Sequence, residues 1–172
     1  MEKINSFAPL IDEQARILIL GSVPSVESLR RSQYYGNPRN HFWPILYRVF
    51  DLDYRRDESY GEKTAMLRER GIALWDVIRD CRRTGSLDAS ITEEEANDFP
   101  WLFGNYPRIR CVLFNGGKAY ETYGRKVGLN TFPDLTCKKL PSTSPANTMP
   151  LAEKLQAWQI IRELTGNDEK SY

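Results

Sequence analysis

Residues that bind metals or form disulfides are scarce in this sequence. The 172 residues include three cysteines and one histidine, His41. Cys81, Cys111 and Cys137 lie far apart, so they form neither a CxxC zinc pair nor a disulfide framework. An iron–sulfur cluster usually takes one more thiolate than the chain offers. We therefore expect no metal and no cofactor, and we expect the cysteines to be small buried side chains.

Long hydrophobic runs are also absent. The most apolar stretch, Ile17 to Leu20, is far too short to span a membrane. The first residues, Met1 to Asn5, lack the basic start and the apolar stretch of a secretory signal. We therefore expect no membrane partner and an intracellular, cytoplasmic location. The length suits one domain, residues 1–172, and the 41% apolar and 27% charged residues are ordinary for a globular protein.

Acidic side chains are missing from two stretches, although the net charge is only +1. Residues 28–50 and 135–152 contain no acid, whereas acids gather within residues 88–98. The two stretches carry several basic residues, namely Arg30, Arg31, Arg39, Arg48, Lys138 and Lys139. Locally basic loops on a near-neutral protein suit a polyanion bound on one face, while ordinary variation of surface charge is the simpler alternative.

Short apolar runs alternate with amphipathic segments, which predicts an α/β fold with an open, largely parallel sheet. Strands are expected at residues 15–21, 109–114 and 136–140. Residues 72–78 suit either a strand or a turn followed by a helix. Helices are expected after a cap at Ser25 or Ser28, at residues 41–50 and 62–70, from Thr92, and at residues 118–128 and 151–164.

Loops rich in small polar residues follow three of these strands, at residues 21–25, 115–117 and 141–145. Ligands in open α/β sheets bind at the carboxyl ends of the strands, so these loops should meet at one edge. Glycine and serine allow close approach of a phosphate, although such turns are also common connectors. The nucleotide-binding patterns GxxxxGK[ST] and GxGxxG are absent.

Aromatic, amide and arginine side chains are concentrated between Tyr34 and Trp43. Exposed aromatic rings beside amides can stack on a nucleobase and read its edge. Phe42 and Trp43 also suit the core-facing side of the next helix, and both interpretations remain open for them.

Together, these segments resemble the uracil-DNA glycosylase superfamily, and most closely its hypoxanthine-DNA glycosylase branch. The resemblance spans residues 17–147 in the order of the family motifs. It is carried by Gly21-Ser22-Val23-Pro24-Ser25, Tyr35-Gly36-Asn37-Pro38-Arg39-Asn40-His41-Phe42-Trp43, Asp76-Val77-Ile78 with Gly85-Ser86-Leu87-Asp88, Phe114-Asn115-Gly116 and Leu140-Pro141-Ser142-Thr143-Ser144-Pro145-Ala146-Asn147. It implies a three-layer α/β/α sandwich around a short, mainly parallel central sheet.

The resemblance also implies roles for individual residues. Asn40 takes the place of the main catalytic residue and Asn115 that of the amide that reads the base edge. Tyr35 takes the place of the aromatic ring that stacks on the flipped base, with Ser22 and Phe42 as further base-binding residues. The residues expected to contact DNA are Ser25, Arg39, Ser142, Ser144, Pro145, Ala146 and Asn147.

Two departures from the wider superfamily favour the hypoxanthine branch. Ser22 stands where many relatives have an aspartate or asparagine that positions water. Ser142 and Ala146 stand where relatives often have histidine or asparagine and a leucine wedge. Asn40 is then expected either to orient water through its carbonyl oxygen or to donate its amide to the leaving purine, while Asn115 offers both a donor and an acceptor.

The resulting hypothesis is a monofunctional, cofactor-free DNA glycosylase that flips out hypoxanthine and hydrolyses its glycosidic bond. Its partner is DNA with a damaged or deaminated base, and we expect a monomer. One alternative is a uracil or mismatch glycosylase. Others are a non-catalytic binder of damaged DNA on the same fold, or a hydrolase of free nucleosides.

Overall fold

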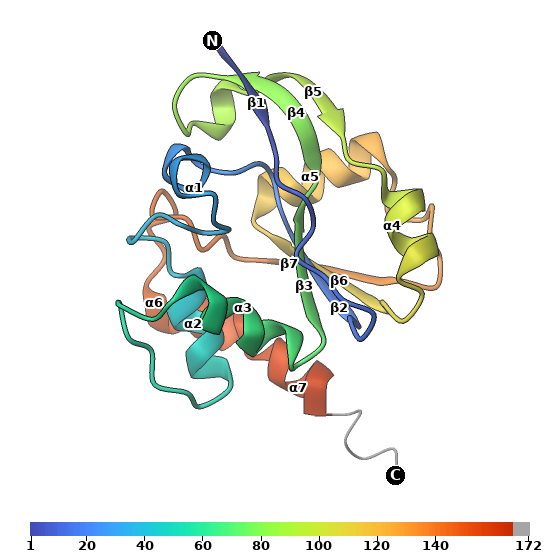
Figure 1. The fold of residues 1–172 in the computed structure, drawn as a ribbon. Coiled ribbons are helices and arrows are strands. Elements are labelled where there is room, and N and C mark those ends of the chain that lie inside the picture. Colours follow the sequence, from blue (N-terminus) through green and yellow to red (C-terminus); the bar gives the residue numbers. More distant parts are fainter. Residues whose placement is uncertain (167–172) are drawn as a thin grey trace.

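A parallel sheet of four strands, in the order β3-β2-β6-β7, forms the centre of the computed structural model, which describes residues 1–166 (Figure 1). Its strands are β2 (Ile17–Gly21), β3 (Ile72–Asp76), β6 (Cys111–Asn115) and β7 (Thr136–Leu140). All residues of β2 and β3 are buried, which explains their continuous apolar runs. The three expected strands are confirmed, and residues 72–76 form a strand rather than a helix.

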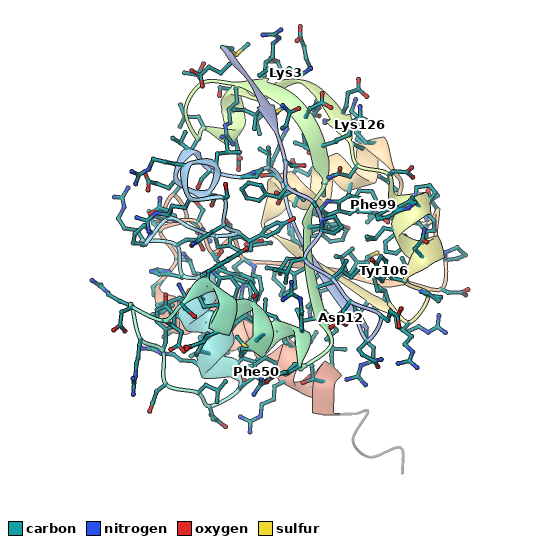
Figure 2. The ribbon with its side chains drawn as sticks, viewed as in Figure 1. Lys3, Asp12, Phe50, Phe99, Tyr106 and Lys126 are labelled. Atoms are coloured by element: carbon teal, nitrogen blue, oxygen red, sulfur yellow. The ribbon has the colours of Figure 1, made fainter. Side chains whose placement is uncertain are left out.

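Helices cover both faces of this sheet. In β2, Ile17 and Ile19 pack into the core beneath α2 (Phe42–Val49), α3 (Tyr60–Arg68), α6 (Leu151–Trp158) and α7 (Ile160–Gly166). Leu18 and Leu20 point to the opposite core, beneath α4 (Phe99–Asn105) and α5 (Gly117–Lys126). Figure 2 shows Phe50 in the first core and Phe99 in the second. The expected three-layer sandwich is therefore confirmed.

A second sheet, which the sequence analysis did not predict, lies beside the N-terminus in Figure 1. It is antiparallel, in the order β1-β4-β5, and contains β1 (Glu2–Asn5), β4 (Ile78–Arg83) and β5 (Thr92–Ala96). A short 3-10 helix, η1 (Asp88–Ser90), connects β4 to β5. Because β4 starts two residues after β3 ends, this sheet extends from the edge where the central strands end.

The helix expected from Thr92 is wrong, because these residues form strand β5. Irregular pairing with β4 and ion pairs hold this segment in the sheet, although Glu93 itself is left-handed with φ of 51°. Glu93 contacts Arg82 at 2.7 Å, and Glu94 contacts Lys118 and Arg125. Tertiary contacts thus override the local helix signal. The helix begins later, at Phe99, where the Asp98 carboxylate accepts a hydrogen bond from the backbone of Trp101.

Other boundaries also differ from the expected ones. The helix expected over residues 151–164 is divided into α6 and α7 at Gln159, α3 begins at Tyr60 after a Ser59 cap, and α5 ends at Lys126. The short helix α1 (Val26–Arg31) is capped by Ser25, as expected. All three cysteines are free, with Cys81 and Cys111 buried and Cys137 half-buried. No helix within residues 1–166 has the length and apolarity needed to cross a bilayer.

Candidate active site

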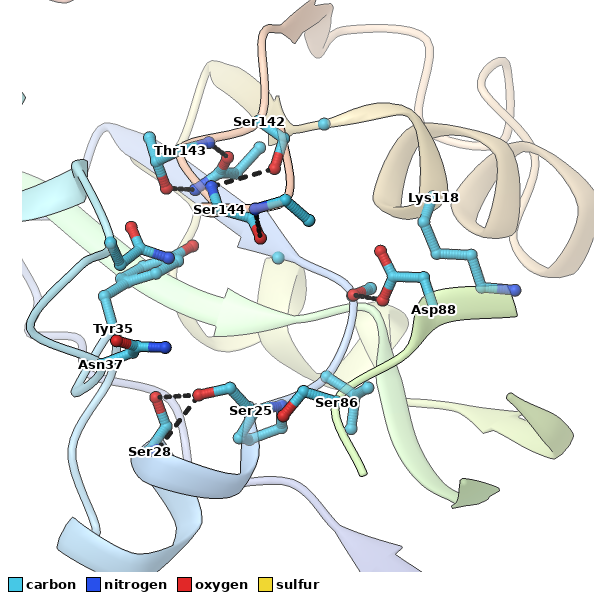
Figure 3. A pocket seen from close by; sticks show the side chains of 18 of the residues that line it. Ser25, Ser28, Tyr35, Asn37, Ser86, Asp88, Lys118, Ser142, Thr143 and Ser144 are labelled. Carbon is cyan, nitrogen blue, oxygen red and sulfur yellow. Dashed lines mark hydrogen bonds between the residues drawn. The ribbon is translucent and has the colours of Figure 1, made fainter. Parts of the chain in front are cut away.

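The three strand-end loops meet around a single cavity of about 610 Å³ (Figure 3). Its floor includes the last residues of β2, β3 and β6, namely Gly21, Asp76 and Asn115. The expected convergence of the loops is therefore confirmed. Of the proposed site residues, Ser22, Ser25, Tyr35, Arg39, Asn40, Asn115, Ser142, Ser144, Pro145 and Ala146 line this cavity.

The loop after β2 is tied to the segment that carries Tyr35. Ser25 Oγ accepts a hydrogen bond from the backbone of Ser28 at 3.2 Å and so caps α1. Ser28 Oγ accepts in turn from the backbone N–H of Gly36 at 2.9 Å. Ser22 Oγ donates to Asp88 at 3.4 Å, the outer limit of a hydrogen bond. The two loops are thus held together through buried Ser28, which the sequence analysis noted only as a possible cap.

Tyr35 adopts a left-handed backbone conformation, with φ of 53°, which is rare for a bulky residue. Its ring stacks on Phe42, with 3.9 Å between centroids and 21° between planes. Phe42 is fully buried behind this ring and packs edge-on against Trp158, so it does not line the cavity. The structure therefore makes Phe42 a support for Tyr35, whereas we had expected it to contact the base.

Asn40 lies at the start of α2, facing the cavity. Its Oδ1 accepts a hydrogen bond from the backbone N–H of Phe42 at 2.9 Å. Its Nδ2 has no hydrogen-bond partner within residues 1–166, so both amide protons are available to a ligand. The next residue, His41, donates its backbone N–H to the Thr143 carbonyl at 3.0 Å. Asn40 is therefore held rigidly next to the loop that follows β7.

Asn115, at the end of β6, is fixed by the loop after β7. Its Nδ2 donates to Thr143 Oγ1, and its Oδ1 accepts from the Thr143 backbone N–H, both at 2.9 Å. Figure 3 shows Thr143 next to Ser142 and Ser144. Thr143 itself is fully buried. The amide that we expected to read the base edge is thus fixed in one orientation by a threonine that the sequence analysis did not assign.

The loop after β7 is closed by its own side chains. Ser142 Oγ accepts from the backbone of Ser144, and Ser144 Oγ accepts from that of Ala146, each at 3.2 Å. Asn147 donates its side-chain amide to the Ser142 carbonyl at 2.9 Å. Asn147 borders a separate, shallower hollow and does not line the main cavity, so its observed contact is with its own loop.

A buried lysine also supports this loop. Lys154 of α6 is fully buried, and its Nζ lies 3.2 Å from His41 Nδ1 and 3.4 Å from the Ser144 carbonyl. Burial lowers the pKa of Lys154, and burial together with Lys154 lowers the pKa of His41. The sequence analysis missed Lys154 because a lysine in an amphipathic helix is normally exposed.

Asp76 was part of the sequence resemblance but received no role. It ends β3, lines the cavity and is only 4% exposed. Its Oδ2 is buried with no hydrogen-bond partner within residues 1–166. Burial raises the pKa of Asp76 to about 7, although the Arg83 guanidinium acts in the opposite direction.

Arg83, Asp88 and Lys118 form a charged wall of the cavity. Arg83 is 2% exposed, and its Nε and Nη2 have no hydrogen-bond partner in the described part of the chain. Burial lowers the pKa of Arg83 and raises that of Asp88. Lys118 pairs with Glu94 at 3.0 Å. This wall can contribute positive charge to the cavity, and the sequence alone did not reveal Arg83.

An α/β/α sandwich with an aromatic ring and two asparagines around a strand-end cavity matches a known class of proteins. The profile of the Uracil DNA glycosylase superfamily matches residues 8–164, and the chain belongs to this superfamily. The resemblance drawn from the motifs is thereby confirmed.

Individual relatives cover almost the whole chain. A protein from Methanosarcina acetivorans named "Hypoxanthine DNA glycosylase" is 40% identical over 157 residues, which are 90% of this chain and 95% of the relative. A protein of the same name from Methanosarcina barkeri is 39% identical over 158 residues, which are 91% and 96% of the two chains.

A solved structure shows the same fold. The solution NMR structure of a Methanosarcina acetivorans protein assigned to the uracil DNA glycosylases superposes with a TM-score of 0.78 and 37% identity. The match covers 94% of this chain and 99% of the other.

Proposed function

We propose that this protein is a monofunctional DNA glycosylase that excises hypoxanthine from DNA containing deoxyinosine. The observation that carries the proposal is that Tyr35, Asn40 and Asn115 line one cavity. The names of the two relatives that are about 40% identical support hypoxanthine as the substrate base.

The cavity suits a base that has been rotated out of the duplex. The outer face of Tyr35 offers a stacking surface, and the fixed amide of Asn115 lies at the end of a central strand. Stacking and hydrogen bonds to the base edge are how flipped bases are held. The serine-rich loops at residues 22–25 and 142–146 form the mouth, where backbone amides and hydroxyls can contact the flanking phosphates.

Asn40 acts on the departing base in this proposal. Its Oδ1 already accepts a backbone hydrogen bond, whereas its Nδ2 is free to donate. A donor aimed at the purine stabilises the negative charge that develops as the glycosidic bond breaks. Of the two roles that the sequence left open for Asn40, the free Nδ2 favours donation to the leaving purine over orientation of water.

A defined excision assay tests the proposal. The purified protein is incubated in EDTA with duplexes that contain a single hypoxanthine, uracil, xanthine or mismatched thymine, and with free deoxyinosine. We expect strand breaks only after alkali treatment, and the sites that give rise to them should form most rapidly at hypoxanthine. Faster excision of uracil would support the alternative substrate, and binding without release of any base would indicate a non-catalytic binder. Rapid cleavage of free deoxyinosine would indicate a nucleoside hydrolase.

Two variants connect the activity with the cavity. Asn40→Ala and Asn115→Ala should each lower the single-turnover rate by about 100-fold or more, because each removes a hydrogen-bond donor from the site. Asn130→Ala is the matched control, since Asn130 is an exposed asparagine outside the cavity. Equal rates for all three variants would contradict the proposed site.

The proposal includes a monomer that acts inside the cell, where its DNA substrate is found. Light scattering of the free protein and of its complex with a short duplex tests the monomer. Localisation of a tagged chain tests the cellular site.

A further inference from the structure

Two oxygen atoms at the floor of the cavity are buried without hydrogen bonds. Among residues 1–166, Tyr35 Oη and Asp76 Oδ2 have no hydrogen-bond partner. A buried polar atom left unpaired costs free energy, and native proteins leave few of them. Both residues line the cavity, so a bound ligand can supply the missing partner.

The two side chains converge beside Gly21. A β-carbon placed on Gly21 would lie 2.6 Å from Asp76 Oδ1 and 3.2 Å from Tyr35 Oη. Glycine at this position therefore keeps a small space open between the end of β2 and the two side chains. In Figure 3 the Tyr35 ring points from its loop toward the centre of the cavity. The hydroxyl and the carboxyl thus border the same part of the floor.

Both groups carry a proton below neutral pH. Burial raises the pKa of Asp76 to about 7. Burial together with Asp76 raises the pKa of Tyr35 well above its ordinary range, although the Asn115 amide acts in the opposite direction. The groups that face Asp76 are the Tyr34 and Tyr35 hydroxyls and the Arg83 guanidinium. Arg83 favours the carboxylate, but burial outweighs it. The protonated Asp76 carboxyl is therefore a hydrogen-bond donor at the floor.

The orientation of a flipped base follows from the position of its sugar. The sugar stays with the DNA strand at the serine-rich mouth, so the six-membered ring of the purine enters first. In hypoxanthine this leading edge carries the carbonyl O6, a hydrogen-bond acceptor. Adenine carries an amino group at the same position, which is a donor.

We propose that the protonated Asp76 carboxyl donates a hydrogen bond to O6 of the flipped hypoxanthine, while the Tyr35 ring stacks on the face of the base. This inference rests on the proposed function and assigns a catalytic and specificity-determining role to Asp76. A carboxylic acid kept neutral by burial is a known hydrogen-bond donor to a developing oxyanion. The adenine amino group would meet the O–H donor instead, which disfavours excision of the normal base.

The chemical step needs only water. The C1′–N9 bond breaks and its electron pair moves onto the purine, where O6 takes up part of the negative charge. The oxygen of water forms the new bond to C1′, water loses one proton and the purine gains one. Asp76 retains its proton as a donor throughout.

The test uses variants that separate the carboxyl donor from packing. Asp76→Val keeps a similar volume without a donor, and Asp76→Asn keeps a donor that does not titrate. Asp134→Asn is the control, because Asp134 is exposed and lies outside the cavity. Melting temperature and binding to an uncleavable duplex verify that each variant is folded.

The measurement is the single-turnover rate of hypoxanthine excision as a function of pH. We expect Asp76→Val to be slower than wild type by about 100-fold. The wild-type rate should fall about tenfold per pH unit above about pH 7, as Asp76 ionises. The Asp76→Asn rate should not change over this range, and Asp134→Asn should follow the wild type.

A purine without a 6-substituent provides a second readout. On DNA that contains nebularine, which lacks O6, Asp76→Val should excise the base as fast as the wild type. Equal losses on nebularine and hypoxanthine would overturn the inference, because the loss would then not depend on O6. A wild-type protein that does not excise hypoxanthine overturns the proposed function. A wild type that does, with Asp76 variants of unchanged rate and pH profile, overturns the assignment of Asp76 alone.

Discussion

Asn115 and Thr143 hold each other by two hydrogen bonds of 2.9 Å, one through a side-chain hydroxyl and one through a backbone N–H. The pair joins the end of β6 to the loop after β7. Through it, the orientation of the Asn115 amide, which lines the cavity, depends on a residue that contributes only its Oγ1 and its backbone.

Replacing Thr143 should therefore disturb the orientation of the Asn115 amide and, through it, recognition of the base. Thr143→Val removes the acceptor of Asn115 Nδ2, and we expect unfolding to be easier by about 1–3 kcal/mol. We also expect KM for hypoxanthine DNA to rise more than kcat falls, since a loosened amide weakens ground-state binding. Urea unfolding and steady-state kinetics provide both values.

Thr122→Val is the matched control for this substitution. Thr122 is also buried, but its Oγ1 has no hydrogen-bond partner within residues 1–166. Thr122→Val should leave the free energy of unfolding equal to or higher than that of the wild type, and KM for hypoxanthine DNA should be unchanged. A Thr143→Val protein with the stability and KM of the Thr122→Val protein would contradict the supporting role of Thr143.

Asn40→Asp separates the structural role of Asn40 from its chemical one. An aspartate can still accept the hydrogen bond from the Phe42 backbone, so we expect little change in melting temperature. It cannot donate to the purine, and the single-turnover rate should fall by about 100-fold or more. Asn40→Ala should show the same loss of single-turnover rate, and its free energy of unfolding should also be lower by about 1 kcal/mol. An Asn40→Asp protein with the wild-type rate would show that Asn40 works through its oxygen, by orienting water.

Asp76 should make stability depend on pH. In the unfolded chain this carboxyl ionises near its ordinary pKa of 3.8, whereas in the folded protein it keeps its proton up to a pKa of about 7. Between these values the folded state binds more protons. The free energy of unfolding should therefore fall as pH rises, by about 1.4 kcal/mol per pH unit.

Urea unfolding of the wild type and of Asp76→Asn, in steps from about pH 4 to about pH 8, measures this dependence. The variant should be the more stable protein at the upper end, and its advantage should shrink toward the lower end. Asp134→Asn should run parallel to the wild type. Parallel curves for the wild type and Asp76→Asn would show that burial does not shift the pKa of the Asp76 carboxyl.

Gly21→Ala should close the floor of the cavity. The new β-carbon would lie 2.6 Å from Asp76 Oδ1, so either the carboxyl or the end of β2 must move. We expect the rate of hypoxanthine excision to fall below about 1% of the wild-type rate, because a displacement of about 1 Å in a catalytic group can lower the rate 100-fold. Gly104→Ala is the control, since a β-carbon there meets nothing within 4 Å. Full activity of Gly21→Ala would show that this space is not used.

The central sheet could be predicted because each strand carries its own signal. Residues 17–20 are all buried, and a strand covered on both faces needs an uninterrupted apolar run. Gly21, which ends the first strand, and the serine-rich loops also predicted the correct edge of the sheet for the cavity. These features depend on neighbours in sequence, which a single chain displays directly.

The features that were missed depend on contacts across the fold. Strand β5 is held by its pairing with β4 and by ion pairs of Glu93 and Glu94, none of which a local helix signal reveals. Asp76 and Lys154 look like ordinary surface charges in sequence, yet both are buried next to the cavity. Their environments arise only when β3 and α6 are packed against distant loops.

The stack of Tyr35 on Phe42 also bears on the thermodynamics of base flipping. Phe42 is immobilised by the core, so the Tyr35 ring is held in place before DNA arrives. A flipped base would then add as the third ring of an existing column, and little conformational entropy of the protein would be lost on binding. Base–aromatic stacking contributes about 1–3 kcal/mol, which is comparable to the cost of unstacking a mispaired base. Folding of the domain has therefore already ordered the Tyr35 ring before DNA binds. The stacking energy is then available to keep the base extrahelical.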